Sequence, residues 1–118
     1  MKKIINSFKY AVQGLIEAFK SEKNMKIHVL IAFLVILAGI IFKISVIEWM
    51  ICIVLIGIVI SAELFNTAIE TTVDLAMPEK NEKAKIAKDV SAGAVLILAI
   101  SSVIIGLIIF LPKILIMI

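Results

Sequence analysis

Residues 49–75 read WMICIVLIGIVISAELFNTAIETTVDL, an apolar run that ends in a series of acidic and amide side chains. The polar series is Glu63, Asn66, Glu70 and Asp74, with steps of three, four and four. On an α-helix these positions fall within about 80° of one another, because each residue turns the chain by about 100°. The stretch therefore predicts one apolar helix that carries an acidic stripe on one face.

The composition of the 118-residue chain is that of a membrane protein. Hydrophobic residues make up 63% of the chain and charged residues 18%, and the mean hydropathy is +1.19. Soluble domains contain only about 45–50% apolar residues. We therefore expect a single all-α membrane domain that covers residues 1–118.

Three apolar stretches are each close to the ~20 residues that cross a ~30 Å hydrocarbon core. They cover residues 27–47, 47–65 and 92–111, and we expect Pro112 to stop the third. Of the twelve lysines, ten lie before the first stretch or between the second and the third, and only two lie elsewhere. The positive-inside rule then predicts a multi-pass protein of the cell membrane with its N-terminus in the cytosol.

Residues 1–26 have the pattern of an amphipathic helix. Apolar side chains recur at helical spacing from Ile4 to Phe19, with lysines and other polar residues between them. A basic amphipathic helix beside a membrane span is expected to lie in the interface with its apolar face down.

Residues 78–91 form a charged connection before the third stretch. Pro78 and the content of Lys, Glu and Ala predict a short cytosolic helix that runs into the span. Lys88 and Asp89 are adjacent on this helix and are candidates to meet a phosphate, although an ordinary charged helix face would also produce such a pair.

The acidic stripe requires an explanation, because an ionised carboxylate inside a bilayer costs on the order of 2.5–3.5 kcal/mol. Glu63 lies deepest and is the hardest to explain by a helix that simply leaves the membrane. Glu63 and Glu70 are two turns, or about 10 Å, apart, which favours one carboxylate for a metal and the other for a proton. Magnesium usually needs further ligands. Glu22 is a candidate, although a glutamate among lysines is more often simply solvated.

The sequence lacks the common nucleotide-binding motifs. It contains no GxxxxGK[ST] loop, no GxGxxG fingerprint and no protein-kinase signature. A bound nucleotide would therefore be held by metal, carboxylates and lysine. A small oligomeric ion or proton pathway is the alternative of another class. Such a pathway should place carboxylates through the depth of the membrane, whereas here they cluster at the expected cytosolic end.

Four segments carry a family resemblance. They read FKYAVQGL at 8–15, EKNMKIH at 22–28, AELFNTAIETTVD at 62–74 and AKDVSAGAVL at 87–96. Together they resemble the bacterial diacylglycerol kinase family, the small three-span lipid kinases. The most specific part is E-x-x-N-[ST]-A-I-E-x-x-x-D followed by A-K-D.

The resemblance implies that the chain phosphorylates a membrane lipid alcohol with ATP and Mg²⁺. It also implies a homotrimer with active sites shared between subunits at the cytosolic face, and no nucleic-acid partner is expected. Glu63 matches the general base, and Glu22 and Glu70 match the metal-holding carboxylates. Asn66 and Asp74 look like supporting residues. The positions that match nucleotide contacts are Tyr10, Glu22, Glu70, Glu79, Lys80, Asn81, Lys88 and Asp89.

Two departures bear on the acceptor. The chain has A-V-Q-G at 11–14 where the Gram-negative type has S-W-K-G, and Lys3 stands where that type has an arginine. The E-x-N-x-x-x-H segment at 22–28 is similar to the Gram-positive branch, whose members resemble undecaprenol kinases. Undecaprenol is therefore the expected acceptor, and diacylglycerol is the alternative.

Overall fold

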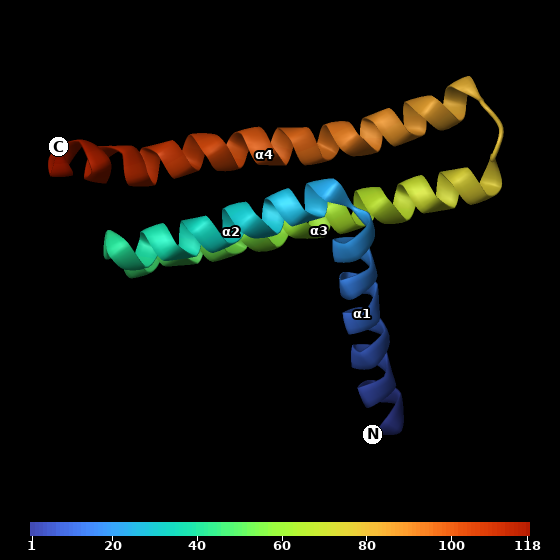
Figure 1. Cartoon of the computed structure of the whole chain (residues 1–118), viewed down its shortest axis with the longest axis horizontal. Helices are drawn as coiled ribbons and strands as arrows, with labels where there is room; N and C mark the ends of the chain where they lie inside the picture. Colours follow the sequence, from blue (N-terminus) through green and yellow to red (C-terminus); the bar gives the residue numbers. More distant parts are fainter.

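The computed structural model describes all 118 residues as four α-helices (Figure 1). They are α1 (Lys2–Ser21), α2 (Lys23–Ile41), α3 (Val46–Ala76) and α4 (Glu82–Met117). The prediction of an all-α protein with an N-terminal helix before three long apolar helices is confirmed. By length and composition α2, α3 and α4 can each cross a membrane, so the chain is a multi-pass membrane protein.

The central helix is α3, which packs against each of the other three. α2 lies along one part of it and α4 runs antiparallel to it, while α1 points away across their common direction (Figure 1). Only 11 of the 118 residues are buried, so the spans present bare Leu, Ile and Val side chains on most of their surface. Such surfaces are suited to cover by lipid or by further copies of the chain.

The corner between α1 and α2 is formed by Glu22. Its backbone is extended (φ −109°, ψ 117°), which interrupts the helix, and its N–H donates to the carbonyl of Ala18. The Glu22 side chain caps neither helix, so its carboxylate stays available for another partner. The apolar side chains of α1, such as Phe8 and Leu15, remain exposed, which leaves that face free for the expected membrane interface.

The turn between α2 and α3 is tightly packed. A Cβ on Gly39 would lie 2.6 Å from Cη2 of Trp49, so only glycine fits beneath the indole ring. Lys43 in this turn has a φ of 51°, in the left-handed region. Ile44 and Cys52 are buried nearby and form a small apolar cluster with α4.

The helices differ in length from the expected apolar stretches. α2 ends at Ile41, before the turn, whereas we placed the end of the first stretch at 47. α4 begins at Glu82 because Asn81 caps it through a bond from the Ala84 N–H, so the expected start at Pro78 is wrong. The expected stop at Pro112 is also wrong, since α4 continues to Met117.

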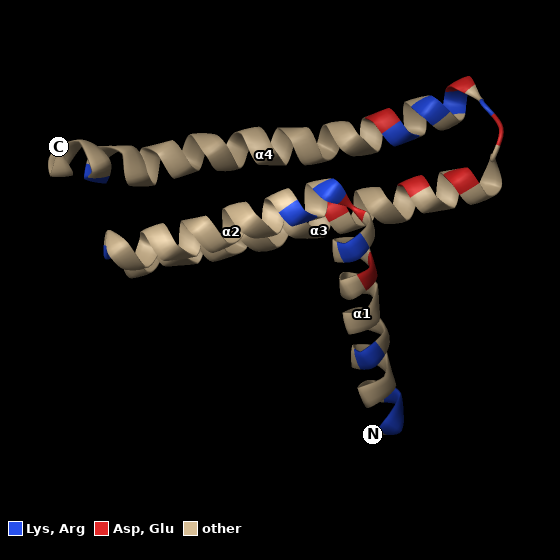
Figure 2. Cartoon of the chain, viewed as in Figure 1, with Lys and Arg blue, Asp and Glu red and all other residues tan.

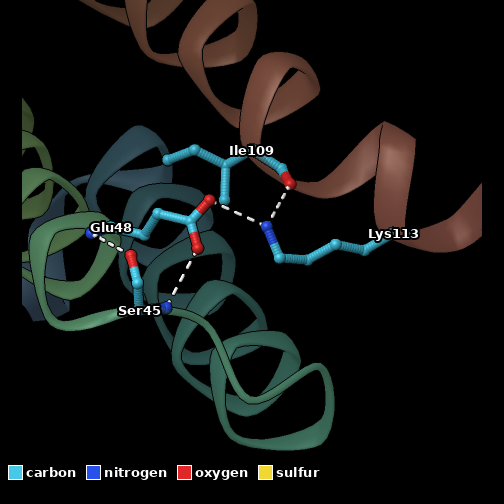
Figure 3. Close-up of polar contacts among 4 residues, drawn as sticks. All are labelled: Ser45, Glu48, Ile109 and Lys113. Atoms are coloured by element: carbon cyan, nitrogen blue, oxygen red, sulfur yellow. Dashed lines mark hydrogen bonds and ion pairs between the residues drawn. The ribbon is translucent and has the colours of Figure 1, made fainter.

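An ion pair joins α3 to α4 in the turn that Pro112 disturbs (Figure 3). Lys113 Nζ lies 2.7 Å from Glu48 Oε2 and also donates to the carbonyl of Ile109 at 2.9 Å. Glu48 is held in turn by a capping box, in which it and Ser45 exchange hydrogen bonds between side chain and backbone N–H. Proline removes one helical donor. Beyond the proline the helix continues, and the Lys113 ammonium group holds this turn to Glu48 on α3.

Replacing Lys113 with methionine is expected to lower the midpoint of thermal unfolding in detergent by a few degrees. The change keeps an extended apolar side chain but removes both hydrogen bonds of the ammonium group. The control is Lys43→Met, because Lys43 forms no ion pair. Equal melting of the two variants would show that the Glu48–Lys113 pair does not hold α4 against α3.

Candidate active site

Glu63 is the most deeply buried polar residue of the chain. It is 1% exposed, and no hydrogen-bond partner reaches its Oε1 atom. Counted from Val46, about 20 residues of α3 span a ~30 Å core and end near Phe65. Glu63 is therefore expected close to a membrane boundary, with Glu70 about 10 Å beyond it along the helix.

Titratable groups from three elements surround this carboxylate. His28 on α2 places Nε2 3.5 Å from Glu63 Oε2. Glu22, at the corner between α1 and α2, and Glu70, two turns along α3, are both near enough to act on Glu63 electrostatically. One oxygen of Glu63 thus faces His28, while the other has no partner within the chain and is free to accept a proton.

Asn66 links the acidic face of α3 to α4. Its Nδ2 donates to Glu70 Oε1 at 2.7 Å, and its Oδ1 accepts from the hydroxyl of Ser91 at 2.7 Å. Asn66 and Ser91 are 5% and 8% exposed, so the hydrogen bond between them is buried, whereas the one to Glu70 is only partly buried. This network fixes one oxygen of Glu70 and leaves the other without a hydrogen bond.

Toward the loop, a second contact joins the same two helices. Lys88 Nζ on α4 lies 2.7 Å from Asp74 Oδ1 on α3, and Asp89 pairs with Lys85 on its own helix at 2.6 Å. These charged side chains line an open hollow of about 800 Å³ together with the loop. Figure 2 shows that charged residues gather on α1, at the corner with α2 and on the ends of α3 and α4 that meet at this loop.

The structure brings together most of the residues singled out from the sequence. Glu22 and Glu70 are near enough to Glu63 to interact with it electrostatically. Asp74 lines the hollow with the loop and α4 candidates, which are Glu79, Lys80, Asn81, Lys88 and Asp89. Tyr10 is the exception, because it lies on α1, is 65% exposed and forms no hydrogen bond within the chain.

Two residues of this region were given no role from the sequence. For His28, only the fold places its ring beside Glu63. Ser91 lies within the A-K-D-V-S-A-G segment, three residues after Lys88, which is the helical spacing that puts both on one side of α4. That spacing could have identified Ser91 as a residue on the same side of the helix as the candidate Lys88.

Comparisons with known proteins show the family of this chain. The family model described as prokaryotic diacylglycerol kinase matches residues 9–110. The chain belongs to the prokaryotic diacylglycerol kinase family. It is 46% identical to an undecaprenol kinase of Bacillus subtilis, over 96% of this chain and 92% of that protein. It is also 39% identical to a diacylglycerol kinase of Synechocystis, over 95% of this chain and 65% of that protein, and 35% identical to one of Haemophilus influenzae, over 80% of each.

Membership of this family makes the chain a lipid kinase, with ATP as the phosphoryl donor that the family implies. The resemblance noted in the sequence is confirmed, and a lipid kinase takes the place of the ion-pathway alternative. Carboxylates and lysines are the kinds of side chain with which a phosphoryl-transfer site positions and neutralises charge, and several of them line the hollow.

The donor set near Glu63 is compatible with a nucleotide-bound magnesium ion. No group of three Asp, Glu, His or Cys side chains in one chain is arranged to hold a metal ion. Magnesium commonly takes only one or two protein carboxylates and fills its remaining positions with water and substrate phosphate. Glu22, whose carboxylate is not used for capping, and Glu70, with one oxygen without a hydrogen bond, suit this role.

Proposed function

We propose that this lipid kinase phosphorylates undecaprenol and that Glu63 is its general base. The observation that carries the proposal is the free, buried Oε1 of Glu63, which sits at the start of a polar face on a membrane-spanning helix. A base in this position can reach the hydroxyl of a lipid whose hydrocarbon chain stays in the membrane. The 46% identity with the undecaprenol kinase supports a polyprenol as the acceptor.

The neighbourhood of Glu63 also suits a long hydrocarbon chain. An apolar groove of about 290 Å³ begins at His28 and runs between α2, α3 and α4. Thirteen of its sixteen lining residues are hydrophobic. Diacylglycerol is the alternative acceptor, because two of the relatives are diacylglycerol kinases.

In this proposal each polar residue has a separate task. Glu63 accepts the proton of the lipid hydroxyl while His28 holds its other oxygen. Glu22 and Glu70 hold Mg²⁺, which when bound neutralises charge on the ATP phosphates. Lys88 binds phosphate, and Asn66 and Asp74 support Glu70 and Lys88 through their hydrogen bonds. The remaining nucleotide contacts are assigned to the loop and the residues beside it, which are Tyr10, Glu79, Lys80, Asn81 and Asp89.

The proposal places the site at the cytosolic face and in a homotrimer. Ten of the twelve lysines lie on the same side as the hollow, which supports that orientation. In a single chain, Glu22 and Glu70 do not form a complete metal site, and most apolar side chains of the spans are exposed. Further copies would cover the spans and bring additional side chains to each site.

The test uses the purified protein in detergent or bicelles with undecaprenol and γ-labelled ATP. We expect labelled undecaprenyl phosphate in the presence of Mg²⁺ and no labelled lipid when the metal is removed with a chelator. Absence of labelled lipid from a folded trimer supplied with Mg²⁺ would overturn the proposal.

A further inference from the structure

The contact between Ser91 and Asn66 is the only hydrogen bond between α3 and α4 whose two side chains are both buried. Serine in a helix commonly donates to the carbonyl four residues earlier on its own helix. Ser7, Ser21 and Ser101 of this chain do so. Ser91 instead directs its one hydroxyl proton across to α3.

Ser91 and Glu70 hold the two ends of the Asn66 amide. Oδ1 accepts from the Ser91 hydroxyl, and Nδ2 donates to the Glu70 carboxylate. The reversed amide would place its oxygen against the Glu70 carboxylate, and two acceptors repel each other, so Glu70 selects this orientation. The hydroxyl of Ser91 then holds the amide in place from α4, in the position from which Nδ2 reaches Glu70.

We propose that Ser91 is a positioning residue for the metal-binding end of the site, acting through Asn66 on Glu70. The inference rests on the proposed function of Glu70 as a metal ligand. Ligands that bind a metal are commonly fixed by hydrogen bonds from a second layer of residues, and loss of such a partner costs about 10-fold or more in metal affinity or activity. Because Ser91 belongs to α4, it also ties the geometry of Glu70 to the packing of α4 against α3.

The first test compares Ser91→Ala with Ser101→Ala in the full-length protein. Ser101 is a matched control, because it is on the same helix and its hydroxyl donates only to the carbonyl of Ile97 on that helix. We expect Ser91→Ala to raise the Mg²⁺ concentration for half-maximal activity about tenfold, and Ser101→Ala to leave it unchanged. Ser91→Thr, which keeps the hydroxyl, should restore most of the wild-type response. A Mg²⁺ response of Ser91→Ala equal to that of the control would overturn the inference.

A double-mutant cycle separates positioning from a general loss of packing. If Ser91 acts through Asn66, then Ser91→Ala should have no further effect on the Mg²⁺ response in an Asn66→Ala background. Additive effects of the two changes would contradict the relay.

Glu70→Gln measured in parallel distinguishes two kinds of failure. If Glu70→Gln changes the Mg²⁺ response and Ser91→Ala does not, the inference about Ser91 fails while the proposed function stands. If Glu70→Gln leaves the response unchanged, the assignment of Glu70 fails, and the inference about Ser91 fails with it.

Discussion

Glu63→Gln is expected to reduce the kcat for lipid phosphorylation by about 10²–10⁴-fold, the usual contribution of a general base. Glutamine keeps the size of the side chain and an oxygen that can face His28, but it cannot take the hydroxyl proton. The variant also removes a charge from a buried position, so the fold should not be weakened. The KM for ATP should change little, because Glu63 lies apart from the loop and lysines that line the hollow.

The matched control is Glu17→Gln, which makes the same chemical change on the exposed surface of α1. The oligomeric state, measured by size-exclusion chromatography with light scattering, should be the same for wild type and both variants. A folded Glu63→Gln protein with the kcat of the control would rule out Glu63 as the base.

Glu70→Gln is expected to lower kcat/KM for ATP by about 10²-fold or more, because metal-ion stabilisation of phosphoryl charge is worth several kcal/mol. The amide still offers an oxygen to Asn66 Nδ2, so this hydrogen bond within α3 can persist while the negative charge is lost. Raising the Mg²⁺ concentration should recover part of the activity. It should recover none in Glu63→Gln, whose defect is in proton transfer.

The informative result is the difference between the responses of the two variants to added Mg²⁺. Titrations of Glu63→Gln, Glu70→Gln and Glu17→Gln with Mg²⁺ under one set of conditions measure this difference directly. An unchanged Mg²⁺ requirement in Glu70→Gln would contradict its assignment as a metal ligand and would leave Glu22 as the remaining candidate.

Local pattern was enough to predict the helices and the acidic face of α3. The steps between Glu63, Asn66 and Glu70 depend only on helical geometry, and the structure adds a hydrogen bond between the last two, which are four residues apart. The apolar stretches predicted the spans because lipid requires helices whose backbone bonds are internal.

Contacts between distant parts of the chain could not be predicted in this way. Ser91 meets Asn66 across 25 residues, and Lys113 meets Glu48 across 65. Both depend on the register of α4 against α3, which is set by side-chain packing along the whole helix pair. The ion pair of Lys113 with Glu48 on α3 likewise holds the part of α4 beyond Pro112, where the sequence pattern predicted an end of the helix.

The most direct test of the central claim is an internal competition between two lipid alcohols. Undecaprenol and a short-chain diacylglycerol are offered at equal mole fraction in one mixed micelle with Mg²⁺ and γ-labelled ATP, and both labelled products are counted. Because the two acceptors share each enzyme molecule, the ratio of products gives the ratio of kcat/KM whatever fraction of the protein is active. We predict that labelled undecaprenyl phosphate predominates. A predominance of labelled phosphatidic acid would contradict the assignment of a polyprenol acceptor.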